Sequence, residues 1–204
     1  MDPYTSLNKT ERMTKLAFLT AVALVLHAAE GVIPVPFPVP GARLGLANTV
    51  TLITIVLLGP TDALVLTIIR TLLGSLLSGR LSSLIFSITG GVFATLIMSM
   101  TYKRLGHILG FSGISILGAT AHNIGQLGIA GIILGTPMVL SYLPILLITG
   151  VATGFLVGLI VSYVLGYLLH GTPFTRSRPE ISISRTDRSP DKLKIVYNKP
   201  KRTP

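Results

Sequence analysis

Six polar or ionisable residues stand inside apolar segments of this 204-residue chain: Glu30, Asn48, Arg70, His122, Asn123 and Gln126. Such side chains are costly in a membrane, so they usually face protein or water and mark a functional site. His122 and Gln126 are four residues apart, and a helix would place them on one face. The planar guanidinium of Arg70 suits a phosphate or a carboxylate. These residues therefore predict a polar pocket that opens outward and binds a small organic anion.

Each of these residues also has a structural interpretation, which stays open at the level of the sequence. Arg70 can pair with Glu30 or with backbone carbonyls, and Asn48 can bridge two helices. The polar group at 122–126 can join neighbouring helices by hydrogen bonds.

Three further residues lie close to this set. Arg43 and Arg80 would give the pocket a positive potential, although loop cations are more often solvated than bound to a ligand. His27 lies one turn before Glu30 and is interpreted as a packed interface residue.

The chain lacks the residues of several enzyme mechanisms. It has no cysteine, no P-loop pattern GxxxxGK[ST] and no HExxH pattern. Asp187 and Asp191 lie near the C-terminus, and no apolar segment holds the paired carboxylates that would bind the Mg²⁺ of prenyl-diphosphate chemistry. We therefore expect a binding or transport component, with no catalytic residues, metal or cofactor, rather than an enzyme.

Composition places these residues in a membrane. Half of the residues are hydrophobic, only 12% are charged, and the mean hydropathy is +0.73. Soluble domains carry about twice that share of charge. About 170 residues supply five or six spans of roughly 20 residues, and we predict an all-α bundle of six transmembrane helices. Its apolar segments are 13–29, 44–58, 63–77, 81–102, 114–134 and 138–169.

Two of these assignments have alternatives. The first segment is either an uncleaved span or a signal peptide ending near Ala28 and Ala29, and the many apolar segments that follow favour a span. The segments 44–58 and 63–77 are short, so they either cross the membrane or form a re-entrant hairpin.

The basic residues predict the orientation. With the N-terminus inside, all loop and tail cations except Arg43 and Arg80 lie on the inner side, as the positive-inside rule requires. We thus expect a cytoplasmic segment 1–12, a transmembrane domain 13–170 and a basic cytoplasmic tail 171–204. The tail is predicted to be disordered near anionic lipid, and the alternative is that its LKIVY run forms a strand or docks on a partner. Its charge fits this placement more simply than nucleic-acid binding.

Two connections carry strong turn signals. The segment GVIPVPFPVPGAR (31–43) repeats proline at every second position, so it is expected to form an extended loop or a lid at the outer surface. Gly59 and Pro60 end a helix, after which Thr61 is expected to cap the next helix with Asp62 in its first turn.

Two stripes of small residues predict close helix contacts. Ala17 and Ala21 form AxxxA in the first segment and either pack in the bundle or dock on another membrane subunit. Gly150, Gly154 and Gly158 form GxxxGxxxG in the last segment, where packing inside the bundle is the favoured interpretation.

Three stretches resemble one membrane-protein family. They are PGARLGLANTVTLITIVLLGPTDALVLTIIRTLLGSLLSG (Pro40–Gly79), FSITGG (Phe86–Gly91) and AHNIGQL (Ala121–Leu127). They are similar to the Gx transporter family, also labelled heptaprenyl diphosphate synthase component I, and the likeness covers about residues 13–168. That family in turn resembles the substrate-binding S-components of energy-coupling factor (ECF) vitamin transporters.

The resemblance implies an S-component-like fold of six helices in the bacterial cytoplasmic membrane. It implies that Ala17 and Ala21 dock on an ECF-type transmembrane coupling subunit, that the loop 31–43 closes the outward pocket, and that two ATPases supply energy. The protein would topple in the bilayer to release its substrate, a vitamin or an isoprenoid- or quinone-related precursor.

Two other functions stay open. The second family label implies a non-catalytic membrane subunit or anchor of a heptaprenyl (polyprenyl) diphosphate synthase, with the basic tail as its docking element. The catalytic subunit of that enzyme would carry the aspartate-rich motifs. A stand-alone transporter is the third function, and the lack of an obvious inverted repeat argues against it.

Overall fold

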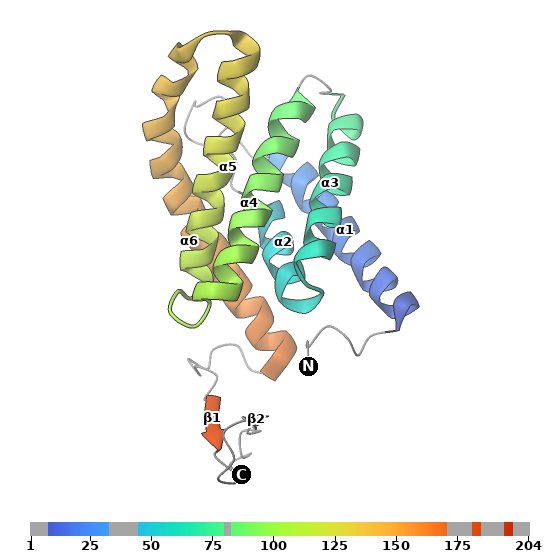
Figure 1. Cartoon of the computed structure of the whole chain (residues 1–204). Helices are drawn as coiled ribbons and strands as arrows, with labels where there is room; N and C mark the ends of the chain where they lie inside the picture. The colour runs from blue at the N-terminus through green and yellow to red at the C-terminus, as the bar shows by residue number, and fades with distance from the viewer. Residues whose placement is uncertain (1–7, 33–44, 80–82, 171–180, 185–193, 198–204) are drawn as a thin grey trace.

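The computed structural model describes residues 8–32, 45–79, 83–170, 181–184 and 194–197, most of which form a helical bundle (Figure 1). This confirms the all-α class of the predicted transmembrane domain. The helices are α1 (Lys9–Val32), α2 (Leu46–Leu57), α3 (Pro60–Leu77), α4 (Leu84–Leu105), α5 (Phe111–Leu134), the short 3-10 helix η2 (Pro137–Tyr142) and α6 (Leu143–His170).

Five helical segments of the described chain are long and apolar enough to cross a membrane: α1, α3, α4, α5, and η2 continued by α6. The 24 residues of α5 rise about 36 Å, more than the roughly 30 Å of a hydrocarbon core. The chain is therefore a multi-pass membrane protein. The expectation of six full spans is wrong for α2, because its 12 residues rise only about 18 Å.

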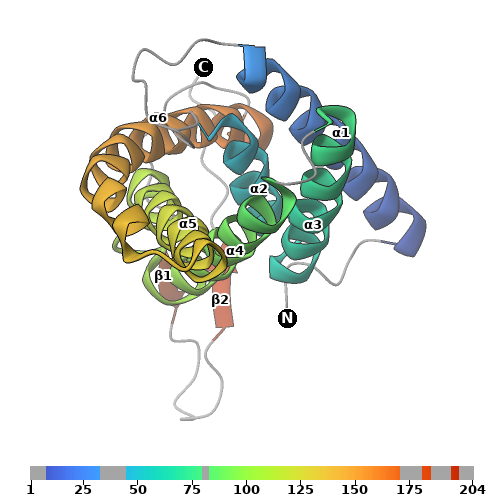
Figure 2. The ribbon, with the colours of Figure 1, turned by 90° about the horizontal axis from the view of Figure 1, so that it is seen from above.

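The short helix α2 lies in the interior of the bundle. It contacts α1, α3, α4 and α6, which enclose it when the bundle is seen from above (Figure 2). Its Leu52 and Ile55 join Met98 of α4, Ile114 of α5 and Val161 of α6 in the main apolar core. Because protein surrounds α2, the helix can begin inside the bundle without exposing backbone groups to lipid.

An ion pair fixes the starts of α1 and α3 at the same end of the bundle. Arg12 donates from Nε to Oδ2 of Asp62 at 2.6 Å, and from a terminal guanidinium nitrogen to Oδ1 at 2.9 Å. Asp62 is buried and Arg12 is half-exposed. The basic residues of the first turns of α1 and of the last turn of α4 lie at this end too (Figure 1). Cations thus gather at one end of the bundle. The prediction that this end faces the cytoplasm stays a prediction.

The glycine stripe of α6 packs against α5, as the favoured interpretation predicted. A Cβ on Gly154 would lie 2.7 Å from the Cα of Ile116, and one on Gly158 would lie 2.2 Å from the Cα of Ser112. Real Cβ atoms do not approach backbone so closely. The helices α5 and α6 therefore meet at backbone level along this stripe.

The turn before α3 differs in one detail from the prediction. Gly59 takes the N-cap position with a φ of 101°, and Pro60 is the first helical residue. Thr61 therefore lies inside the helix and does not cap it. Proline suits the first helical position because its fixed φ and missing N–H cost nothing there. Asp62 lies in the first turn, as predicted.

The proline-rich segment and two of the predicted cations fall largely outside the described residues. Gly31 and Val32 belong to α1, so the helix continues two residues into the segment predicted as a loop. The rest of the segment lies outside the described part of the chain, and so do Arg43 and Arg80.

The tail contains a short antiparallel pair of strands. β1 (Ile181–Ser184) pairs with β2 (Lys194–Tyr197), and Ile181 stands opposite Tyr197. Most of the LKIVY run thus forms a strand, which matches the alternative to disorder.

Candidate functional site

A polar cavity of about 80 Å³ lies between the six α-helices. Its lining includes all six residues that the sequence predicts for a pocket: Glu30, Asn48, Arg70, His122, Asn123 and Gln126. Glu30 and Arg70 are each only 5% exposed. The structure therefore brings the predicted residues together from α1, α2, α3 and α5, while their role in binding a ligand stays a prediction.

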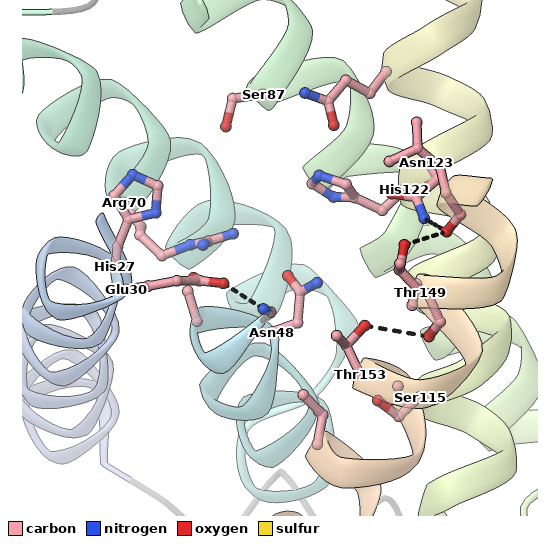
Figure 3. A pocket seen from close by; sticks show the side chains of 18 of the residues that line it. His27, Glu30, Asn48, Arg70, Ser87, Ser115, His122, Asn123, Thr149 and Thr153 are labelled. Atoms are coloured by element: carbon pink, nitrogen blue, oxygen red, sulfur yellow. Dashed lines mark hydrogen bonds between the residues drawn. The ribbon is translucent and has the colours of Figure 1, made fainter. Parts of the chain in front are cut away.

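One side of the cavity, the α1–α3 wall, consists of His27 and Glu30 of α1, Asn48 of α2 and Arg70 of α3 (Figure 3). The carboxylate of Glu30 accepts a hydrogen bond from the backbone N–H of Gly45, the N-cap residue of α2. A helix N-terminus stabilises a nearby negative charge, which explains how this carboxylate can be buried. Arg70 comes from the middle of α3 and points its guanidinium into the cavity (Figure 3).

The opposite side, the α5–α6 wall, consists of Ser115, His122, Asn123, Gln126, Thr149 and Thr153. The amide nitrogen of Asn123 donates to the backbone carbonyl of Leu146 in α6 at 2.6 Å. The hydroxyls of Thr149 and Thr153 donate to carbonyls of their own helix. Inter-helix bonding, the structural interpretation of this polar group, thus applies to Asn123. His122 points from this wall toward Arg70 (Figure 3).

Three lining side chains occupy space that a neighbouring helix leaves free at a glycine. A Cβ at each glycine would lie 2.8–3.1 Å from the side chain in question, which is too close. The pairs are His27 with Gly74, His122 with Gly90, and Asn123 with Gly150. Close helix packing therefore positions the polar groups of both walls.

Sequence reasoning missed part of the lining. The missed residues are Ser83, Ser87, Ser115, Thr149 and Thr153. Hydroxyl residues give little signal, because Ser and Thr in helices commonly bond a carbonyl of their own helix wherever they occur. His27, interpreted as a packed residue, both packs on Gly74 and lines the cavity. A glycine in the middle of an apolar helix is the signal that could have indicated these close contacts.

The donors of the cavity suit an organic ligand. The described residues that line it include one carboxylate, one guanidinium and two imidazoles. Among the residues that the structure describes, no three His, Cys, Asp or Glu side chains gather as a candidate metal site. The cavity thus combines hydrogen-bond donors and acceptors with two groups of opposite charge, the carboxylate of Glu30 and the guanidinium of Arg70.

The predicted docking residues Ala17 and Ala21 are both exposed on the outer face of α1. Val25 extends this face by one more turn, and Thr20 and Ala23 lie buried on the opposite side of the helix. Either lipid or a partner helix can therefore contact the alanine pair, and docking stays a prediction.

The fold and the cavity together define a multi-pass helical membrane protein with an internal polar site. The model of the heptaprenyl diphosphate synthase component I family matches residues 19–164, from the first half of α1 to near the end of α6. The chain therefore belongs to this family. Comparison with curated proteins and with solved structures finds no match.

Proposed function

We propose that this protein is the substrate-binding subunit of an uptake system in the bacterial cytoplasmic membrane. It resembles an S-component, binds a small organic anion in the polar cavity, and depends on separate ATPase subunits for energy. The chain itself carries out no reaction. The observation that carries the proposal is the convergence of Glu30, Arg70, His122 and other polar groups on one cavity inside a membrane bundle.

The guanidinium of Arg70 is the group of this cavity that would bind an anionic group of the ligand. Arg70 is buried, and both it and Ser83, the N-cap residue of α4, line the cavity. The N-terminus of α2 also faces the cavity, and its Gly45 N–H already holds the carboxylate of Glu30. A buried guanidinium near helix N-termini favours a carboxylate or a phosphate on the ligand.

Docking on a coupling subunit would use the outer face of α1. Ala17 and Ala21 are small and exposed, so a partner helix can approach the α1 backbone closely there. Small residues at such positions serve helix association in membranes. Energy would come from the partner's ATPases, in accord with the absence of a P-loop pattern from this chain.

Affinity purification of the tagged, full-length protein in mild detergent tests the proposal. Mass spectrometry of the proteins that accompany it is expected to find two ATPases and a transmembrane coupling subunit. The variant carrying both Ala17→Trp and Ala21→Trp should lose them, because the indoles block close approach. Ile148→Trp is the matched control, since Ile148 is 71% exposed on α6 and far from the alanine pair in sequence. Absence of ATPases from the unmodified protein would contradict the proposal.

A second candidate is favoured by the family to which the chain belongs. Its name denotes one component of a heptaprenyl diphosphate synthase. The chain would then be a non-catalytic membrane subunit or anchor of a synthase. The same purification distinguishes the two functions, because this candidate predicts recovery of a soluble prenyl synthase without ATPases.

A further inference from the structure

A second cavity adjoins the polar one and has the opposite character. It is open on one side, where Leu134 is 60% and Tyr142 52% exposed, its volume is about 360 Å³, and its lining is almost entirely apolar. The lining residues are Phe86, Gln126, Leu127, Ala130, Leu134, Val139, Tyr142 and Leu146. An apolar cavity of about 150 Å³ accommodates a benzene molecule, so this one has room for a larger hydrocarbon group.

The two cavities share part of their walls. Gln126 of α5 and Leu146 of α6 line both of them. Gln126 presents an amide that can bond a polar group, whereas Leu146 offers apolar surface. The boundary between the cavities is therefore formed by one polar and one apolar side chain.

The same helices change character at this boundary. Along α5 the lining runs from His122 through Gln126 to Ala130 on one helical face. All the lining residues of α5 after Gln126 are apolar, whereas those before it include polar side chains such as that of His122. The chain leading into α6 changes in the same direction, from Thr149 back to Val139. Since α5 rises 1.5 Å per residue, His122 and Ala130 lie about 12 Å apart along the axis.

We propose that the ligand is a small amphiphile whose anionic head lies in the polar cavity near Arg70 and whose short hydrocarbon tail lies in the apolar cavity beside Ala130. This inference rests on the proposed function and adds the class of its ligand. The tail is assigned to the second cavity because Gln126 and Leu146 line both cavities, which makes them neighbours. A ligand of this kind satisfies both cavities at once, since apolar surface leaves water while the head keeps its hydrogen bonds.

Monoalkyl phosphates of increasing length test the inference directly. The full-length protein is placed in nanodiscs of dioleoyl phosphatidylcholine, and ethyl, butyl and hexyl phosphate are titrated calorimetrically, with empty nanodiscs as the blank. Each methylene that enters the apolar cavity should tighten binding about fourfold. Hexanol, which lacks the head group, should bind much more weakly than hexyl phosphate.

Variants that fill the apolar cavity separate it from the surrounding lipid. Ala130→Phe and Val139→Phe enter the cavity from α5 and from η2, so each should abolish the gain with chain length while leaving ethyl phosphate binding unchanged. Two variants from different elements are used so that a folding defect in one does not decide the result. Ile132→Phe is the matched control, because Ile132 is 77% exposed on the same helix and should keep the full gain.

Four results of these titrations would each overturn the inference: equal binding of ethyl and hexyl phosphate, a gain that survives both cavity-filling variants, hexanol binding as tightly as hexyl phosphate, or no binding of hexyl phosphate. Competition by a membrane lipid is a fifth. A membrane lipid could supply the same head chemistry. Dioleoyl phosphatidic acid added to the nanodiscs should therefore leave hexyl phosphate binding unchanged. Competition by this lipid would assign the site to a lipid and overturn the proposal that the ligand is a small amphiphile.

The co-purification of ATPases is a separate readout, so recovery of ATPases without a chain-length gain would contradict this inference alone.

Discussion

The two walls of the polar cavity hold their polar groups in different ways. The α1–α3 wall carries Glu30 and Arg70, which are buried and ionisable, and the carboxylate is stabilised by a backbone N–H at the start of α2. The α5–α6 wall carries amides, hydroxyls and the imidazole of His122, and the amide of Asn123 and the hydroxyl of Thr149 donate to backbone carbonyls of α6. The buried carboxylate and guanidinium thus lie on one wall, and the hydrogen bonds to α6 lie on the other.

The difference between the walls reflects the different free-energy costs of burying charged groups and amides in a membrane bundle. Burying charge costs much more than burying an amide, so charged groups are placed only where a dipole or an opposite charge offsets the cost. Amides and hydroxyls need only a nearby carbonyl, which close helix packing provides. Both walls depend on close packing at a glycine, Gly74 for His27 and Gly150 for Asn123, and the α1–α3 wall depends in addition on its electrostatics.

The largest expected effect is the loss of the α5–α6 wall through Gly158→Ala. The new Cβ would lie 2.2 Å from the Cα of Ser112, so α5 and α6 must separate. Overpacking of this kind typically lowers the free energy of unfolding by about 1–3 kcal/mol. Thermal unfolding followed by circular dichroism in detergent measures it.

Gly131→Ala is the matched control for that substitution. Gly131 lies on α5, and a Cβ there would meet nothing within 4 Å. Alanine also favours a helix over glycine, so this variant should be as stable as the unmodified protein or slightly more so. Equal unfolding temperatures for the two variants would mean that backbone contact along the stripe does not hold α5 to α6.

Substitutions at Arg70 and His122 compare the contributions of the two walls to ligand binding, because one residue comes from each wall. Arg70→Ala removes a charged donor and should weaken ethyl phosphate binding about tenfold to a hundredfold. His122→Ala removes an imidazole from the other wall, and a neutral hydrogen bond is worth only about twofold to tenfold. Calorimetric titration measures both, and circular dichroism checks that the bundle stays folded. Unchanged binding in both variants would remove the proposed site.

A smaller effect on stability tests whether Gly150 makes room for the hydrogen bond of Asn123. Asn123→Ala removes one inter-helix hydrogen bond, worth about 0.6 kcal/mol on average in membrane proteins. Gly150→Ala places a Cβ 2.8 Å from the amide nitrogen of Asn123 and should displace it from the Leu146 carbonyl. The two substitutions should therefore be non-additive, with Gly150→Ala nearly neutral once Asn123 is alanine. Additive losses of stability in a double-mutant cycle would show that the glycine and the amide act independently.

The sequence predicts the α1–α3 wall more completely than the α5–α6 wall. Charged and amide residues inside apolar segments are rare, so Glu30, Asn48 and Arg70 can be recognised without a structure. Thr149 and Thr153 cannot be recognised in this way, since a hydroxyl in a helix bonds its own backbone whether or not it lines a cavity. Helix content follows from the length of apolar segments.

What the sequence leaves open depends on contacts between distant parts of the chain. The interior position of α2 allows it to be shorter than a membrane span, and nothing in the segment 44–58 alone indicates that other helices surround it. The contact of Gly74 with His27 and that of Gly90 with His122 join different helices, so local spacing does not predict them. The apolar cavity likewise forms only where α4, α5, η2 and α6 meet.

The smallest expected effect is that of deleting residues 172–204. Among the described residues, none of the tail lines either wall, and the family match ends at residue 164, before the end of α6. Deletion should therefore leave ethyl phosphate binding and the recovery of ATPases unchanged, as measured by titration and by co-purification. The anchor function predicts a different result, because the basic tail would then be the docking element, and its removal should abolish recovery of a prenyl synthase. A binding partner lost on deletion, with the cavity still able to bind ethyl phosphate, would locate the partner-binding function in the tail rather than in the membrane bundle.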